Sequence, residues 1–441
     1  MKKIYLLLPF IIIFIANGAE ATEVKEIKTK NSFNVWLVEE HSNPIISVNI
    51  AFRNSGSSYD PDGKEGLIKL AGSMLTEGAG NMNSESFTNS LEEKAIKLSF
   101  SAGDDNFYAN LNTLSEYKQQ AFYYLGLALS KPRFDKKPLD RLKRQIISLI
   151  KENEKKPYYL LDREWKKQIF GSHPYAKPDY GYQNTVKSIS KKDLKNFTSN
   201  YLTKENIIIS VVGDITEQEL VELIDKNLNN LPKKYSSAIK IKDISVQKGA
   251  KQTIIDKDIP QTIILFSMEG IKRNSPDYID AYVMNYILGG GTLTSRLNDN
   301  LRAKKGLTYS ISSDLSPMNH AAVFGGGFAT RNDKAKEAVS ILKETIKQMV
   351  ENGVTEKEIR DAKKFLIGSF MVKLDSNSSI VNFLTMMQLH NLGIDYMNRR
   401  NKLINEVTVE KANNIAKKLI KTDKLQIVMI GKPKFDGEVK P

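Results

Sequence analysis

The sequence contains no cysteine among its 441 residues. This absence excludes disulfide bonds, thiol catalysis and thiolate metal sites, so packing alone must stabilise the fold. Histidine is also scarce, and no two of the four histidines lie within one helical turn of each other. They are His41, His173, His320 and His390. A histidine-based zinc site would therefore require the fold to gather them from distant segments.

The sequence has one long hydrophobic run, at the N-terminus, and none after it. Residues 1–3 include two lysines, and residues 4–15 are almost wholly apolar. This run is shorter than the roughly 20 residues that a membrane-spanning helix needs. Small and polar residues follow it, which is typical of a secretory signal peptide over residues 1–21, cleaved after Ala19 or Ala21. An uncleaved N-terminal anchor is the alternative. We expect an exported protein, most simply periplasmic, with no stable membrane insertion after cleavage.

Extreme composition is absent as well, because 41% of residues are hydrophobic and 26% are charged. Both values are ordinary for soluble globular chains, and the length is enough for two to four domains with real cores. The net charge is +14. Since the lysines are scattered and no segment interleaves arginine with aromatic residues, we expect a basic solvated surface and no nucleic-acid partner.

An internal repeat decides the architecture. Three pairs of similar segments occur in the same order at separations of 216, 219 and 218 residues: 44–50 with 260–266, 139–147 with 358–366, and 207–213 with 425–431. The first and third pairs read as strands and the second as an amphipathic helix. This pattern predicts an α+β protein of two homologous domains, each a mixed, mainly antiparallel sheet with helices on one face. The predicted domains are 22–232 and 252–441, joined by a polar, lysine-rich linker at 233–251.

In the first half, a helix is predicted from near Glu65, after a turn-forming run. Apolar residues recur along it at helical spacing and form its buried stripe: Leu67, Leu70, Ala71, Met74 and Leu75. Lys69, Gly72 and Ser73 share another face. Their spacing of i, i+3 and i+4 is the one that an inverted zinc motif, His-x-x-Glu-His, uses to converge on a metal.

In the second half, Gly289, Gly290 and Gly291 predict a flexible turn before a helix that Thr294 or Ser295 caps. The helix is predicted to end at Gly306, which suits a left-handed cap. Basic residues fill its last turns, as the helix dipole favours: Arg302, Lys304 and Lys305. A strand with Leu307, Tyr309 and Ile311 on one face should follow. A phosphate-binding loop is excluded, since no Gly-Lys-Ser/Thr follows the glycines at the required spacing.

Residues 62–74 and 288–310 closely resemble two motifs of the insulinase, pitrilysin and mitochondrial-processing-peptidase family of zinc peptidases, and the likeness extends from about residue 24 to 431. It implies a two-domain clamshell. In that family the first motif carries two histidine zinc ligands and a catalytic glutamate, whereas this chain has Lys69, Gly72 and Ser73. An ammonium group repels a divalent cation, glycine has no side chain, and a serine hydroxyl is a poor zinc ligand.

The family's third zinc ligand is a glutamate that aligns with residues 146–151, where Leu149 and Ile150 stand at the matching positions. Glu152 and Glu154 lie close by, and a small slip in the alignment would bring one of them to the site. An acidic residue there would not replace the other missing ligands. The resemblance therefore implies no metal and no cofactor in this chain. The loop around His173 resembles the family's Gly-x-His-Pro loop, which is structural.

The second motif implies that Arg302 and Tyr309, seven residues apart as in the family, reach into an active-site cleft. A guanidinium and a phenol both donate hydrogen bonds, and together they would fix a peptide carbonyl and stabilise charge that develops on its oxygen. The alternative is that Arg302 pairs with a surface carboxylate and Tyr309 packs at a domain edge.

The resemblance implies a non-catalytic, substrate-binding and activating subunit of an exported zinc metallopeptidase that degrades peptides or proteins. Its partner would be a homologue that carries the His-x-x-Glu-His motif and the zinc. Two alternatives remain: a stand-alone peptide-binding or chaperone-like protein, and an active metallopeptidase with unfamiliar ligands.

Overall fold

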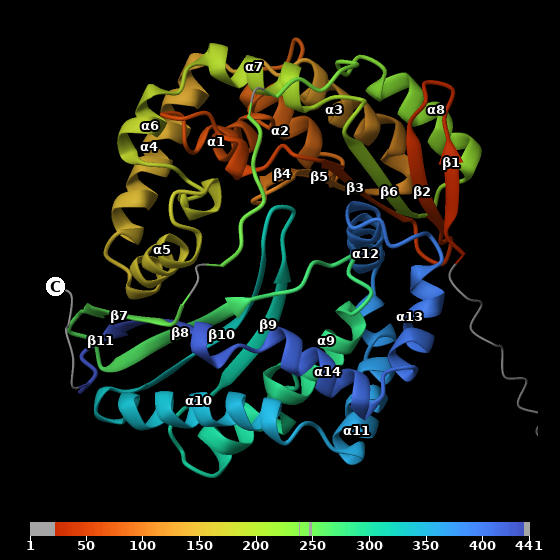
Figure 1. Ribbon diagram of the computed structural model, residues 1–441. Coiled ribbons are helices and arrows are strands. Elements are labelled where there is room, and N and C mark those ends of the chain that lie inside the picture. The colour runs from red at the N-terminus through yellow and green to blue at the C-terminus, as the bar shows by residue number, and fades with distance from the viewer. Residues whose placement is uncertain (1–22, 238, 247–248, 436–441) are drawn as a thin grey trace, which may run out of the picture.

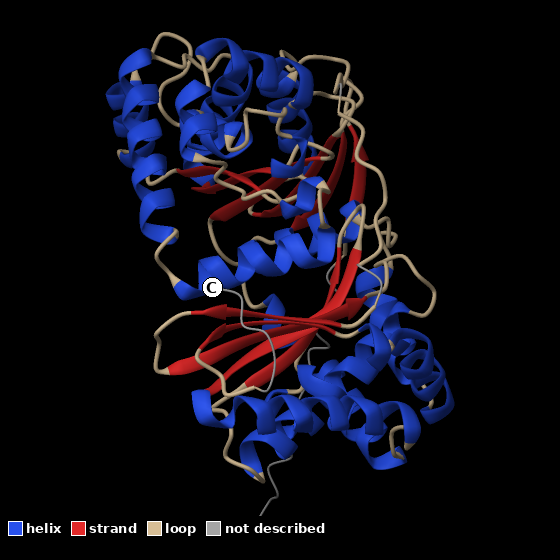
Figure 2. Ribbon diagram, turned by 60° about the vertical axis from the view of Figure 1, so that its left-hand side comes forward, coloured by secondary structure: helices blue, strands red, loops and turns tan. Residues whose placement is uncertain are grey.

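The computed structural model describes residues 23–237, 239–246 and 249–435, so the predicted signal peptide lies outside the described residues. Two β-sheets face each other, with most helices on their outer sides (Figures 1 and 2). The first sheet comprises β1 (Lys25–Lys28), β2 (Asn34–Glu39), β3 (Ile45–Phe52), β4 (Lys97–Ala102), β5 (Phe107–Leu114) and β6 (Ile207–Gly213). The second comprises β7 (Lys251–Asp256), β8 (Gln261–Glu269), β9 (Ile311–Pro317), β10 (Ala322–Arg331) and β11 (Gln426–Gly431).

The helices divide between the two halves of the chain. In the first half they are α1 (Leu67–Met74), α2 (Ser84–Glu92), α3 (Lys118–Ser130), α4 (Lys136–Asn153), α5 (Pro157–Phe170), α6 (Gln183–Ser188), α7 (Lys191–Tyr201) and α8 (Glu217–Leu228). In the second half they are α9 (Tyr278–Asn285), α10 (Ala335–Glu351), α11 (Glu356–Gly368), α12 (Asn377–Leu389), α13 (Tyr396–Asn405) and α14 (Val409–Leu419). Among the helices described, none is both long enough and apolar enough to cross a membrane.

The strand orders confirm that the two halves repeat one fold. The orders are β1-β2-β6-β3-β5-β4 and β7-β11-β8-β10-β9, which are the same apart from the added β1. In each sheet a single neighbouring pair is parallel, β2 with β6 and β7 with β11, and the other pairs are antiparallel. The segments matched in the sequence fall on equivalent elements, β3 with β8, α4 with α11 and β6 with β11. The predicted α+β clamshell is confirmed.

Each half has its own apolar core between the sheet and its outer helices, built around residues such as Phe52 and Phe107 in the first half and Phe266 and Phe324 in the second. The inner face of each sheet is covered by a helix of the other half. Helix α12 packs on β3 and β6, and α5 packs on β8 and β11. The sequence predicted helices on one face of each sheet, and this exchange adds one helix to the opposite face. It explains why β3 is buried along nearly its whole length.

The exchanged helices bind through polar side chains as well as apolar ones. On the first sheet, the Thr385 hydroxyl donates to the Ser210 hydroxyl at 2.9 Å, and the Gln388 side-chain nitrogen donates to the same oxygen at 2.8 Å. On the second sheet, the Trp165 indole N–H donates to the Ser267 hydroxyl at 3.0 Å. Buried polar groups that are paired in this way fix the position of each helix along the sheet, because a shift would leave them unsatisfied.

The segment between the halves has no helix or strand in its described part before Lys251, where β7 begins. The predicted linker of residues 233–251 therefore includes the first residue of that strand. Part of the segment is packed rather than free, since the Ile244 N–H donates to the His320 carbonyl at 2.8 Å and Val246 is buried.

Candidate functional site

Helix α1, which carries the positions of the missing metal ligands, begins on a buried carboxyl group. Asp60 accepts hydrogen bonds from the backbone N–H groups of Gly66 at 2.7 Å and Ile68 at 2.9 Å. Burial raises the pKa of Asp60 to about 8, although these two N–H groups oppose the shift. The helix starts at Leu67, two residues after the predicted start, and the predicted apolar stripe is confirmed because all five of its residues are buried.

The three positions that replace the zinc motif are occupied in ways that oppose metal binding. The Lys69 ammonium donates to the Ala102 carbonyl at 3.1 Å and lies 5.2 Å from the centre of the Tyr180 ring. Gly72 is buried, and a Cβ there would lie 3.3 Å from the Phe100 carbonyl oxygen. The Ser73 side chain is exposed. A cation with its own neutral partners therefore occupies the position of the family's first histidine.

The helix that would carry the third ligand also lacks an acidic group directed at α1. Helix α4 packs on α1, and Ile150 at the matched position is 1% exposed within the first core. Glu152 is exposed and pairs with Lys156 at 2.8 Å. Glu154 is exposed too, and it accepts a hydrogen bond from the Gln183 amide at 3.1 Å. In the described part of the chain, no group of three or more acidic or histidine side chains lies close enough to hold a metal ion.

The four histidines are not gathered in one place. His41 lies 2.7 Å from Asp214, which raises the pKa of the imidazole. The ring nitrogens of His320 lie 3.1 Å from the Tyr59 hydroxyl and 3.1 Å from the Asp243 carboxylate, at the contact between the two halves.

His173 has the structural role that its loop motif implied. Its Nδ1 accepts from the Tyr175 N–H at 3.2 Å, and its Nε2 lies 2.9 Å from the Lys242 carbonyl. These contacts fix the turn and join it to the segment that connects the halves. The fourth histidine, His390, is largely buried, and burial together with Arg273 and Arg53 lowers its pKa.

Of the three consecutive glycines of the second half, Gly289 and Gly290 end a helical segment and Gly291 forms a bend after it, so only the last lies in a turn of the kind that the sequence predicted. Helix α9 continues into the π-helical segment η4 (Tyr286–Gly290). A Cβ on Gly289 would lie 2.3 Å from the Ser313 hydroxyl, and one on Gly291 would lie 2.7 Å from the Tyr286 carbonyl. The glycines allow close packing against β9, where Ser313 donates to the Asn285 side chain at 2.6 Å.

The predicted end of the following helix at Gly306 is confirmed. The π-helical segment η6 (Asn298–Ala303) leads to Gly306 with φ of +59°. The Leu307 N–H donates to the Leu301 carbonyl at 2.8 Å, and the Gly306 N–H donates to the Arg302 carbonyl at 3.0 Å. This is the left-handed cap that a glycine supports.

The predicted strand after Gly306 begins later than expected. Leu307 and Ile311 are buried, but Tyr309 between them is 86% exposed and precedes β9, which begins at Ile311. The Thr308 hydroxyl donates to the Ser310 carbonyl at 2.8 Å and accepts from the Ser310 N–H at 3.3 Å. This local turn competes with strand pairing and directs Tyr309 outward.

Arg302 and Tyr309 both project into solvent at this edge of the second sheet. Within the described ranges, neither side chain makes a hydrogen bond, an ion pair or a ring contact. The alternative of an Arg302 ion pair and a packed Tyr309 is therefore wrong. The two residues lie in the second domain, whereas Lys69, Gly72 and Ser73 lie in the first. No hydrogen bond or ion pair between described residues joins the two sets.

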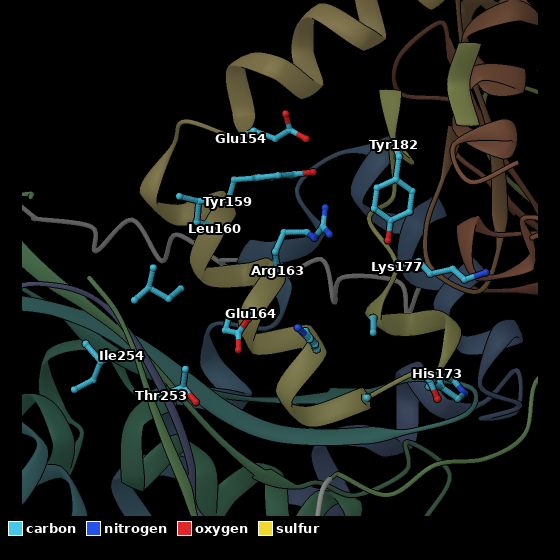
Figure 3. Close-up of a pocket in the computed structure, with 15 residues that line it drawn as sticks. Glu154, Tyr159, Leu160, Arg163, Glu164, His173, Lys177, Tyr182, Thr253 and Ile254 are labelled. Carbon is cyan, nitrogen blue, oxygen red and sulfur yellow. The ribbon is translucent and has the colours of Figure 1, made fainter. Parts of the chain in front are cut away.

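A large groove lies elsewhere, along α5 and β7, and we call it the α5 groove (Figure 3). Its volume is about 850 Å³. Tyr159 and Arg163 line it from the first half of the chain, and Thr253 and Ile254 line it from the second. Because β7 and β9 are opposite edges of the second sheet, the groove and Tyr309 lie on different sides of the molecule.

The polar wall of the α5 groove combines cationic and aromatic side chains with two carboxylates, those of Glu154 and Glu164. The Arg163 guanidinium lies over the rings of Tyr182 at 5.3 Å and Tyr159 at 5.9 Å. The Tyr159 hydroxyl is buried without a hydrogen-bond partner. At the other end, burial opposes the charge of Lys177, but hydrogen bonds to Asp62 and Glu65 raise its pKa overall. No local sequence pattern indicates this groove, because its walls come from segments about 90 residues apart.

Comparisons with known proteins match nearly the whole of both domains. The family model described as insulinase (peptidase family M16) matches residues 35–181, and the one described as peptidase M16 inactive domain matches residues 188–366. The chain belongs to the insulinase family of peptidases. A Helicobacter pylori protein named "Non-peptidase homolog YmxG" is 28% identical to it over 442 residues, covering 99% of this chain and 100% of that protein.

Two solved structures share the fold of this insulinase-family chain. A peptidase M16 inactive domain from Pseudomonas fluorescens has a TM-score of 0.87 and 28% identity, covering 95% of this chain and 99% of its own. The periplasmic protease PqqL from Escherichia coli has a TM-score of 0.80 and 16% identity, covering 94% of this chain and 46% of its own. The contacts of Lys69, Gly72 and Ser73 agree with the Helicobacter pylori and Pseudomonas fluorescens matches in indicating a non-catalytic member of the family.

Proposed function

We propose that this chain is the substrate-binding and activating subunit of an exported zinc peptidase, working with a homologue that carries the His-x-x-Glu-His motif. One observation carries the proposal. Arg302 and Tyr309 keep the family's spacing and stand exposed without side-chain partners, while the metal positions on α1 have been replaced. A buried or paired arginine would have a structural task of its own, and these two residues have none in the described chain.

The chemistry of the pair suits substrate binding in a partner's site. A guanidinium remains charged at every physiological pH, and a phenol adds a neutral hydrogen-bond donor. Both would donate to a peptide carbonyl and to the negative charge that develops on its oxygen during attack by zinc-bound water. The partner would supply the metal and the catalytic carboxylate, so neither chain alone would hydrolyse peptides efficiently. Zinc would be bound only in the partner.

Export to the periplasm is part of the same proposal. It is supported by the N-terminal pattern of residues 1–21. The Escherichia coli neighbour of the same fold is a periplasmic protease. We expect the partner in the same compartment.

A second candidate function is a stand-alone peptide-binding or chaperone-like protein, and the α5 groove favours it. Strand β7 is an edge of its sheet and pairs only with β11 among the described strands. The Lys251 N–H donates to the carbonyl of Leu425, just before β11, and the Lys257 N–H donates to the carbonyl of Gly431 at its end. Alternation along a strand then directs the backbone groups of Gln252, Ile254 and Asp256 away from the sheet. An extended peptide could add to this edge with its side chains in the groove.

Co-expression with a zinc-bearing homologue from the same organism tests the first function. The pair should cleave peptides in a chelator-sensitive way, and Arg302→Ala or Tyr309→Phe should reduce kcat/KM by about 100-fold, as loss of one oxyanion donor does. Arg331→Ala is a matched control, because Arg331 is exposed in the same domain and its ion pair among the described residues is with Asp333, at 2.7 Å. Unchanged turnover in both site variants would refute the role of the pair.

Affinity capture from the envelope fraction separates the two candidates. Recovery of a homologue with the His-x-x-Glu-His motif in stoichiometric amount supports the subunit, and the same complex should persist with Arg302→Ala. Recovery of peptides alone, with binding weakened by Arg163→Ala in the α5 groove, supports the stand-alone function.

A further inference from the structure

A second cavity, which we call the aromatic pocket, lies within the second half of the chain. It has a volume of about 390 Å³ and is bounded by α9, α12, α13 and the short helix η8 (Met371–Leu374). Helices α9, α12 and α13 lie near one another in Figure 1, with α12 near the middle of the picture and α9 and α13 below it. Five rings line it: Tyr278, Tyr282, Phe370, Phe383 and Tyr396. A cavity of this size and lining suits a small organic group with an apolar body.

The charges in the aromatic pocket all have one sign. Arg273, Lys373 and Arg400 line it, and none of the lining residues is acidic. Arg400 is 7% exposed, and its guanidinium contacts neutral groups among the described residues. These are the Leu366 carbonyl at 3.3 Å, the Asn401 side-chain oxygen at 3.1 Å and the Phe370 ring at 4.2 Å.

Arg273 repeats this arrangement. It donates to the Tyr396 hydroxyl at 2.7 Å, and its guanidinium lies 4.2 Å from the centre of the Tyr278 ring. Neither Arg273 nor Arg400 pairs with a carboxylate within the described chain. Arg399 on the same helix differs, since it pairs with Asp395 at 3.1 Å and does not line the pocket. Arg400 is buried and Arg273 is partly exposed, and a guanidinium withdrawn from water ordinarily has an anionic partner. Two such groups without a carboxylate in one cavity leave a positive charge that an anionic ligand would balance.

We propose that the aromatic pocket binds a ligand with a free carboxylate next to an aromatic or aliphatic group. The carboxylate would accept hydrogen bonds from Arg273 and Arg400, which have N–H groups beyond those already used. The apolar body would lie among the five rings. Two sources share this chemistry, a free small acid and the C-terminal residue of a peptide. The inference goes beyond the proposed pairing with a zinc-bearing homologue and does not depend on it.

Calorimetric titration of the purified chain with N-acetyl-L-phenylalanine tests the proposal. We expect a dissociation constant at or below about 1 mM. N-acetyl-L-phenylalanine amide, which lacks the charge, should bind about tenfold more weakly or not at all, because a charge-assisted hydrogen bond contributes at least that factor. A hexapeptide that ends in phenylalanine identifies the source. Binding as tight as that of the small acid indicates a peptide terminus, and binding of the small acid alone indicates a free metabolite-like acid.

Matched arginine variants locate the site. Arg273→Gln should weaken the binding of N-acetyl-L-phenylalanine at least tenfold, whereas Arg399→Gln should change it by less than about twofold. Thermal unfolding of both variants checks that the fold persists. If Arg273→Gln does not fold, the acid and amide comparison on the wild-type chain still decides the question. Absence of binding, equal affinity for the acid and the amide, or equal effects of the two variants would each overturn the proposal.

Discussion

Substitution of Gly289 by alanine probes the packing that holds the Arg302 and Tyr309 segment against the second sheet. The added methyl group would lie 2.3 Å from the Ser313 hydroxyl and 2.8 Å from the Leu297 side chain, both of which must move. The Ser313 hydroxyl also donates to the Asn285 side-chain oxygen at 2.6 Å, and the Ser313 carbonyl accepts from the Asn285 side-chain nitrogen at 3.0 Å. The change therefore disturbs a buried hydrogen-bonded pair as well as the apolar contact.

The magnitude follows from three contributions. Overpacking of a close-packed site costs about 1–3 kcal/mol. Weakening one buried hydrogen bond adds about 1 kcal/mol. Replacing glycine by alanine in a helical segment returns about 0.5–1 kcal/mol. We expect Gly289→Ala to lower the free energy of unfolding by about 1–3 kcal/mol.

Gly368 supplies the control, because it ends α11 and a Cβ there would meet no atom within 4 Å. Gly368→Ala should leave the free energy of unfolding unchanged or raise it by up to about 1 kcal/mol. Urea unfolding followed by tryptophan fluorescence measures both variants, since Trp165 lies on the inner face of the second sheet. Equal stability of Gly289→Ala and the wild type would refute the packing explanation of the three glycines.

Three further predictions concern the first domain, the helix exchange and the exposed pair. Asp60→Asn should abolish the part of the pH dependence of stability that comes from the Asp60 carboxyl group. The pKa of Asp60 is raised to about 8, so its contribution to stability is greatest below about pH 4 and is lost as the pH rises through 8. As the pH rises from 5 to 8.5, the urea midpoint of the wild type should therefore decrease relative to that of the variant. Parallel pH profiles of the two proteins would contradict this. Thr385→Val should lower the free energy of unfolding by about 1–2 kcal/mol, since Ser210 loses a buried partner, and a urea titration without this loss would contradict the polar role of the exchanged helix. Arg302→Ala and Tyr309→Phe should each change stability by less than about 0.5 kcal/mol, as exposed residues without partners do, and a larger loss in thermal unfolding would indicate a structural role.

The fold was predictable because the repeated segments carry strong periodic patterns. The Ile- and Val-rich strands at 207–213 and 425–431 fall at the same place in the two sheets, and the stripe of α1 is buried as its spacing required. The exchange of α5 and α12 was not predictable. An amphipathic helix shows which face it buries, but its sequence does not say which of two similar sheets receives that face.

The candidate site was predictable only where one short segment determines it. The loss of metal ligands follows from Lys69, Gly72 and Ser73 alone, and the cap at Gly306 follows from its position after a helix. The exposure of Tyr309 was missed because alternation from Leu307 to Ile311 indicates a strand, whereas the Thr308 and Ser310 turn interrupts it. The α5 groove and the aromatic pocket both depend on residues that are distant in sequence, so no local pattern indicated them.

The central claim is that this chain has lost the metal half of an insulinase-family site. Its most direct test is the zinc content and peptide cleavage of the purified chain, measured together with and without a chelator. Our account predicts far less than one zinc per chain and no chelator-sensitive cleavage. Stoichiometric zinc with cleavage that the chelator abolishes would contradict it.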